Sequence, residues 1–166
     1  MRRLAPIPAV ALLALLAAAP AFASINYVGQ TDQGNDFNLR TDDAGVPERA
    51  SYGWDMNCKG GGSLTNGGTV SRFPGADVNG MKSAGKYEAP IENRFVGVFK
   101  GKIRGNRASE TRFTGTFKVK VKVFKKSNGD LLTKCSTGIV RWSADRTTPV
   151  EPPGLPRAAE ADLRLR

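Results

Sequence analysis

The chain has 166 residues, a formal net charge of +10, two cysteines and no histidine. Without an imidazole, neither a Ser-His-Asp triad nor a Cys-His pair can be assembled. Two isolated cysteines cannot close a zinc site. We therefore predict no cofactor, no metal and no enzymatic activity, in a chain long enough for one ordinary domain.

Residues 1–23 have the features of a secretion signal. Two arginines precede an apolar run at 9–19, and the sequence AFA at 21–23 is a small-x-small cleavage pattern. The apolar run is too short to span a bilayer. We expect cleavage before Ser24, a secreted or extracytoplasmic product, and a net charge lowered from +10 to +8 by loss of the two arginines.

The front half of the remaining chain alternates apolar and polar residues, which predicts β-strands at 25–31, 36–40 and 51–58. In the third of these, Cys58 shares the parity of the aromatic residues, so we expect it on the buried face. The glycine-rich stretch 59–69 is predicted to be a connection between strands.

Alternation returns at 93–105 and at 112–124, with the loop 106–110 between them. Phenylalanines occupy one parity of both segments and lysines and arginines occupy the other. We expect the two segments to pair as a hairpin with a buried face and a cationic face.

Asn128-Gly129 is the strongest hairpin signal in the chain, and it predicts antiparallel pairing of 113–125 with 130–142. The apolar parity changes within 130–142, from odd positions to even ones. A bulge at 136–138 would reconcile the two halves.

The two cysteines of an exported chain predict one disulfide, Cys58 to Cys135. Trp54 and Trp142 lie near these cysteines on core-facing positions, so we expect them to pack in the interior. We predict an all-β fold, an antiparallel sandwich or a partly open barrel of seven or eight strands. We expect a monomer.

The domain is expected to cover residues 24–144. From 145 to 166 the chain is rich in proline and charge, which predicts a disordered tail.

The stretches YVGQTDQG, FTGTFKVKV and CSTGIVRWSA occur in this order along the chain. In this arrangement the chain resembles a group of small exported β proteins common in high-GC actinobacteria. The resemblance implies the fold and the compartment, and it implies no activity.

Positive charge is concentrated in residues 93–126, which contain eleven Lys and Arg against the single acid Glu110. These lysines and arginines could bind an extracellular polyanion or a component of the cell envelope. The interpretation we favour is that these cations are the solvated side of the strands, where lysine discourages pairing with other chains, because the aromatic residues lie on the opposite parity. The candidate anion-binding residues are Lys100, Lys102, Arg104, Arg112, Lys118, Lys120 and Lys122.

Other chemistries have weaker signals. The glycines of 59–69 lack the lysine and hydroxyl of a phosphate-binding loop, and Asp36, Asp42 and Asp43 lack the spacing of a calcium loop. A carboxylate pair for glycan hydrolysis would have to come from Asp32, Asp36, Asp55 or Glu92. We predict a non-catalytic binding or envelope-associated module, with polyanion binding and glycan hydrolysis as alternatives.

Overall fold

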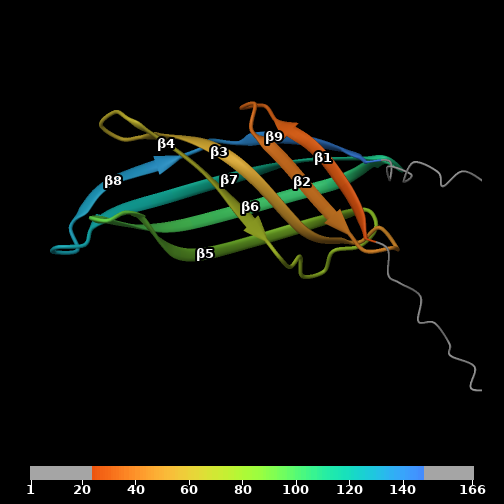
Figure 1. Ribbon diagram of the computed structural model, residues 1–166, viewed down its shortest axis with the longest axis horizontal. Coiled ribbons are helices and arrows are strands. Elements are labelled where there is room, and N and C mark those ends of the chain that lie inside the picture. The colour runs from red at the N-terminus through yellow and green to blue at the C-terminus, as the bar shows by residue number, and fades with distance from the viewer. Residues whose placement is uncertain (1–23, 148–166) are drawn as a thin grey trace, which may run out of the picture.

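The computed structural model describes residues 24–147, and in this range it contains β-strands and no helix (Figure 1). The predicted leader, 1–23, and residues 148–166 of the predicted tail lie outside the described residues. The all-β class is confirmed. The strands are β1 (Ile25–Thr31), β2 (Asp36–Thr41), β3 (Pro47–Cys58), β4 (Ser63–Val70), β5 (Gly80–Glu92), β6 (Phe95–Ser109), β7 (Arg112–Lys125), β8 (Leu131–Ser136) and β9 (Val140–Arg146).

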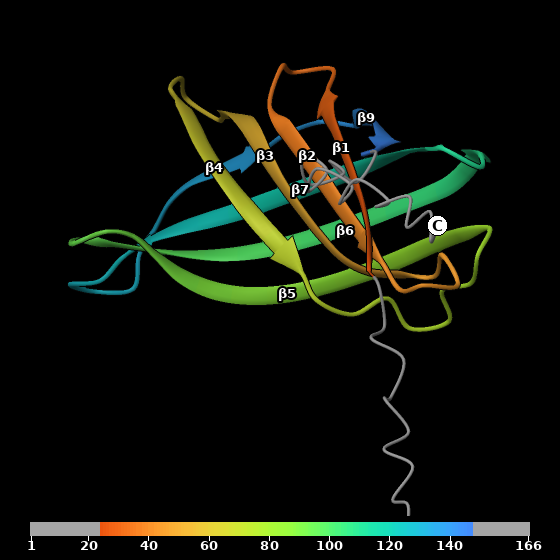
Figure 2. The same cartoon turned by 45° about the vertical axis from the view of Figure 1, so that its right-hand side comes forward.

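All strand pairs are antiparallel, and the sheet follows the order β4-β3-β2-β1-β9-β7-β6-β5. β8 pairs with both β7 and β3, so six strands form a ring: β3, β2, β1, β9, β7 and β8. Within the described chain, β4 and β5 each pair with one neighbouring strand only, and the wall stays open between them. The fold is therefore a partly open barrel (Figure 2), in which β1–β4 cross the long strands β5–β7 obliquely.

β7 organises this arrangement. One edge of β7 pairs with β6 along almost its whole length. The other edge pairs with β9 at 112–117 and with β8 at 120–124. β6 and β7 are thus interior strands, with partners on both edges, and only β4 and β5 present an unpaired edge along the opening.

The core lies on the inner side of the barrel and consists of residues at alternating positions along the strands, including β5 and β6. Its aromatic rings stack closely: the ring centroids of Phe37 and Trp142 are 4.0 Å apart, and Tyr27 packs edge-on against Phe113. Trp54 and Trp142 are both buried, as predicted. The other large buried side chains include Leu39, Met56, Phe99, Ile103, Phe117, Val119, Val121 and Val140.

The Cys58–Cys135 disulfide is present and joins β3 to β8. Only two register pairs connect these strands, Asn57 with Ser136 and Cys58 with Cys135. Both sulfur-bearing residues lie on the inner side, where Cys135 is buried and Cys58 packs against the core. The disulfide therefore closes the ring at its narrowest connection.

Three local predictions need correction. The segment 130–142 is two strands rather than one bulged strand, because the chain leaves the sheet at 137–139, where Gly138 has a φ of 72°. The stretch 59–69 contains strand β4, because its small residues fit closely beside β3, where a Cβ on Gly68 would meet the Trp54 ring at 2.6 Å. β6 continues through most of the expected loop 106–110 and ends at Ser109.

The sequence analysis did not predict strand β5. Its glycine, alanine and proline residues give no clear apolar alternation, and the strand forms on the edge of the sheet by pairing with β6. β9 continues to Arg146, two residues into the segment predicted as tail. Nowhere in residues 24–147 is there a helix long and apolar enough to cross a membrane.

Candidate functional site

The outward face of β5–β8 contains a hollow of about 670 Å³ whose rim is cationic. The hollow draws its lysines from four strands and from the turn after β3, so it is assembled by the fold rather than by one segment. Asn57, Ser136 and the half-buried Phe124 complete the polar and apolar parts of its wall. We call this site the lysine hollow, after its members Lys59, Lys86, Lys100, Lys120, Lys122 and Lys134.

Strand register places like charges directly opposite each other. Lys100 lies between Lys86 of β5 and Lys120 of β7, so three lysines form one row across three strands. Like charges at directly opposed positions destabilise a sheet. Three further opposed cationic pairs lie in neighbouring rows. The complete set within β5–β8 is Lys82–Arg104, Lys86–Lys100, Lys100–Lys120, Lys102–Lys118 and Lys122–Lys134.

Carboxylates do not neutralise the lysine hollow. The ion pairs found among residues 24–147 are Arg40–Glu48 and Arg112–Asp145, and neither includes a lysine of the hollow. On the outward face of β5, Glu88 is opposite Val98. The cations of the hollow are therefore left to solvent or to an external anion.

The structure brings together some of the candidate anion-binding residues and separates others. Lys100, Lys120 and Lys122 line the lysine hollow, whereas Lys102, Arg104 and Lys118 lie on the same face beside it. Arg112 lies at the far end of β7, with its Nε atom 3.4 Å from the Asp145 carboxylate.

Three members of the hollow were missed by sequence reasoning. Lys86 belongs to the unpredicted strand β5, and Lys59 follows β3 in a turn. Lys134 could have been found, because it neighbours Cys135 in a predicted hairpin strand and therefore faces outward.

Replacing Lys120 by glutamate is expected to raise the free energy of unfolding by about 0.5–1 kcal/mol. The new carboxylate would face Lys100 and remove one lysine–lysine repulsion. Urea unfolding at low ionic strength measures the gain, which should shrink as salt screens the charges. Arg112→Glu is the matched control, because it places an acid beside Asp145 and should lower stability. An unchanged or lower stability of Lys120→Glu would contradict the proposed repulsion.

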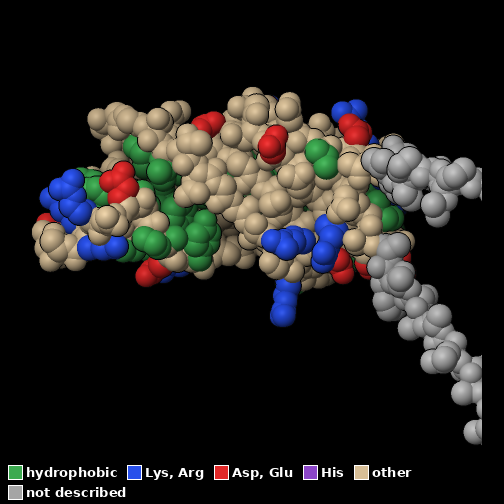
Figure 3. All heavy atoms as spheres, viewed as in Figure 1, with side chains coloured by type: hydrophobic (Ala, Val, Ile, Leu, Met, Phe, Trp, Pro, Cys, Tyr) green, Lys and Arg blue, Asp and Glu red, His purple; other side chains and the backbone are tan. Residues whose placement is uncertain are grey.

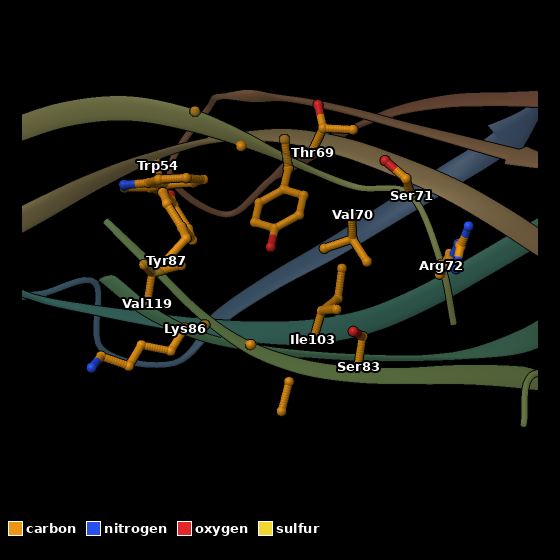
Figure 4. Close-up of a pocket in the computed structure, with 16 residues that line it drawn as sticks. Trp54, Thr69, Val70, Ser71, Arg72, Ser83, Lys86, Tyr87, Ile103 and Val119 are labelled. Carbon is orange, nitrogen blue, oxygen red and sulfur yellow. The ribbon is translucent and has the colours of Figure 1, made fainter. Parts of the chain in front are cut away.

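A second concave region lies on the inner side of the fold, between the open edges of β4 and β5. It has a volume of about 530 Å³ and a mainly apolar lining. In Figure 3, hydrophobic side chains reach the surface in the part of this face between β4 and β5. Figure 4 shows Trp54 and Tyr87 at one end and Arg72 at the other, while Lys86 points away. We call this the aromatic cleft, defined by Tyr52, Trp54, Tyr87, Ile103 and Val119.

The two tyrosines of the aromatic cleft stay protonated well above neutral pH. Burial, with a smaller contribution from the nearby Tyr87, raises the pKa of Tyr52 to about 12. Burial also raises the pKa of Tyr87 above its ordinary value. Both hydroxyl groups are therefore neutral hydrogen-bonding groups at physiological pH.

Two of the candidate carboxylates, Asp55 and Asp42, make structural hydrogen bonds. The two oxygens of Asp55 accept hydrogen bonds from Thr65 and Asn35, which lower the pKa of this carboxyl. Asp42 accepts a 2.7 Å hydrogen bond from the Val46 amide and holds the turn after β2. No group of three or more Asp, Glu, Cys or His side chains suited to a metal ion occurs among the described residues.

Comparisons with protein-family models, with curated proteins and with solved structures match nothing. The resemblance to exported β proteins stays a prediction, and function has to be argued from the geometry alone.

Proposed function

We propose that this protein is an exported, non-catalytic binding module whose ligand is an anionic polymer of the cell envelope. The observation that carries the proposal is the row of opposed, unneutralised lysines around the lysine hollow. Export itself rests on the leader pattern, and the disulfide is compatible with an extracellular location.

The explanation of lysine as edge protection accounts for only part of this surface. Lysines on an exposed edge strand discourage pairing with other chains, and Lys82 and Lys86 on β5 fit that role. Lys100, Lys120 and Lys122 lie on strands with partners on both edges, where no edge needs protection. Their repulsion costs stability, and such costs are characteristic of functional sites.

The lysine hollow favours binding of a charged polymer backbone over stacking of nucleic-acid bases. Proteins that bind single-stranded nucleic acids interleave aromatic side chains with cations, so that bases can stack. In the lysine hollow, Phe124 is the one aromatic residue, and it is half-buried. A polymer with repeated phosphate or carboxylate groups can bind the lysines of the hollow without a stacking surface.

The test is binding of the chain from Ser24 to Arg166 to purified poly(glycerol phosphate) wall polymer between about 50 and 200 mM salt, the range in which phosphate contacts weaken. We expect affinity to fall steeply with salt. The triple variant Lys118→Glu, Lys120→Glu, Lys122→Glu should bind on the order of 100-fold more weakly at the lowest salt. Its new acids face Lys102, Lys100 and Lys134, so the variant is expected to fold.

The control variant changes the same net charge outside the hollow: Arg94→Glu, Lys125→Glu, Lys126→Glu. Equal losses in the two variants would mean that binding depends on total charge only, and the proposed site would be wrong. Tighter binding to single-stranded DNA than to the wall polymer would favour a nucleic-acid ligand instead.

A further inference from the structure

The floor of the aromatic cleft has no side chain at two positions. Gly85 of β5 and Gly101 of β6 are paired in register, and both line the cleft. A Cβ atom added to either glycine would have no atom within 4 Å. Gly85 is exposed and Gly101 is half-buried, so the open space above this pair is part of the cleft and can be reached from solvent.

A second glycine pair on the same inner face shows the ordinary arrangement. Gly105 of β6 is opposite Gly115 of β7, and the Trp142 ring lies against both. There the missing side chains make room for a residue of the protein itself. Over Gly85 and Gly101, no side chain of the described chain fills the space.

Two rows of larger side chains flank this floor. Tyr87 and Phe99 form the row on one side, and Ser83 and Ile103 form the row on the other. Flanking residues four positions apart on one strand are separated by roughly 13 Å. We call the space over Gly85 and Gly101, between the two rows, the slot. Stacked aromatic rings prefer centroids about 4.5–7 Å apart, so the slot has room for one flat ring system beside the row of Tyr87 and Phe99.

Tyr87 lies at one end of the space over the two glycines and lines the cleft. One face of its ring stacks on Phe99, with centroids 4.9 Å apart and planes 4° from parallel. Tyr87 is nevertheless 46% exposed, so part of its ring remains accessible to a molecule bound in the cleft.

Tyr52 adds a polar group to this apolar site. The residue is only 8% exposed and lines the cleft, and its hydroxyl has no hydrogen-bond partner among residues 24–147. The hydroxyl is not one of the buried polar atoms that lack a partner, so its oxygen is accessible from the cleft. A bound molecule with a hydroxyl or carbonyl group could supply a partner.

We propose that the aromatic cleft binds a small, uncharged, planar aromatic molecule of one or two fused rings. The ring lies over Gly85 and Gly101 beside Tyr87, and a polar substituent hydrogen-bonds to the Tyr52 hydroxyl. The cleft volume of about 530 Å³ is in the range of small-molecule sites. This site is separate from the lysine hollow and goes beyond the proposed polymer binding, because the two lie on opposite faces of β5 and β6.

The probe is 2-naphthol, titrated into the oxidised chain from Ser24 to Arg166 by calorimetry. We expect saturable binding that Gly101→Val weakens about 10- to 100-fold by filling the slot. The same variant should unfold at an unchanged or higher temperature, because its new side chain enters open space. Gly85→Val is a second blocking variant on the facing strand and should act in the same direction.

Tyr52→Phe tests the polar contact. It should weaken 2-naphthol about 2- to 10-fold and leave 2-methylnaphthalene, which has no hydroxyl, unchanged. Lys120→Glu, on the outward face, should leave both ligands unaffected. Absence of 2-naphthol binding, or equal binding by folded Gly101→Val and the parent chain, would overturn the proposal. Either result would leave wall-polymer binding untouched, so the two proposals can fail separately.

Discussion

Replacing Cys58 and Cys135 together by alanine is expected to lower the free energy of unfolding by about 4 kcal/mol. The two residues are 77 positions apart, so the disulfide closes a long loop and removes many conformations from the unfolded chain. In the chain-entropy model, closing a short loop stabilises a protein by about 3 kcal/mol and closing a very long one by about 4.7 kcal/mol. The loop closed here should give a stabilisation between these two values. Urea unfolding of the oxidised parent and the double variant measures the difference.

The structural reason for this sensitivity is the connection between β3 and β8. Beyond the disulfide, this part of the ring is held by the pairing of Asn57 with Ser136 and by two hydrogen bonds of Lys59. Its amide donates to the Lys134 carbonyl (2.9 Å), and its carbonyl accepts from the Thr133 hydroxyl (2.8 Å). Loss of the disulfide should therefore open the barrel on the side of the lysine hollow, which includes both Asn57 and Ser136. The parent chain with reduced and alkylated cysteines serves as the control. A loss of less than about 1 kcal/mol would show that hydrogen bonding alone holds the ring closed.

Gly115→Val is expected to destabilise the protein by about 3 kcal/mol or more, or to prevent folding. A Cβ at this position would meet Cζ2 of Trp142 at 2.5 Å and would overlap the backbone oxygen of Arg104. Neither can yield easily, because the Trp142 ring is itself stacked on Phe37 and the backbone oxygen belongs to the paired strand β6.

The matched control is Gly101→Val, an identical change on the same inner face of the sheet. Its Cβ enters open space, so we expect stability to be unchanged or slightly higher. Thermal unfolding of the two variants without ligand provides the comparison. Equal destabilisation would mean that the floor of the aromatic cleft is closed in solution, and the small-molecule proposal would lose its basis.

Much of the fold was accessible from local patterns. Strands β1, β2, β3, β6 and β7 follow from apolar alternation, because each has one face in the core and one in solvent. The β7–β8 hairpin follows from Asn128-Gly129, where Gly129 has a φ of 76°. Strand β4 was missed because small residues such as Gly68 make room for the Trp54 ring and break the apolar alternation. Strand β5 was missed because Ser83 and Gly85 occupy inward positions that face an open cleft instead of a filled core.

The candidate sites were predicted less completely. Parity placed Lys100, Lys120 and Lys122 on one face, but parity along single strands does not reveal which lysines of other strands lie opposite them. The partners Lys86 and Lys134 appear only with the register of β5 and β8. The aromatic cleft had no sequence signal, since Tyr52 and Trp54 have the pattern of ordinary core residues.

The sequence by itself determined the β class, the disulfide pairing and the cationic side of β6 and β7. These properties depend on residue type and on a period of two, which are local quantities. The tertiary structure alone decided that the ring closes through β8, that lysines from four strands surround one hollow, and that β4 and β5 leave a cleft open. Each of these depends on strand order and register, which arise from contacts between residues far apart in the chain.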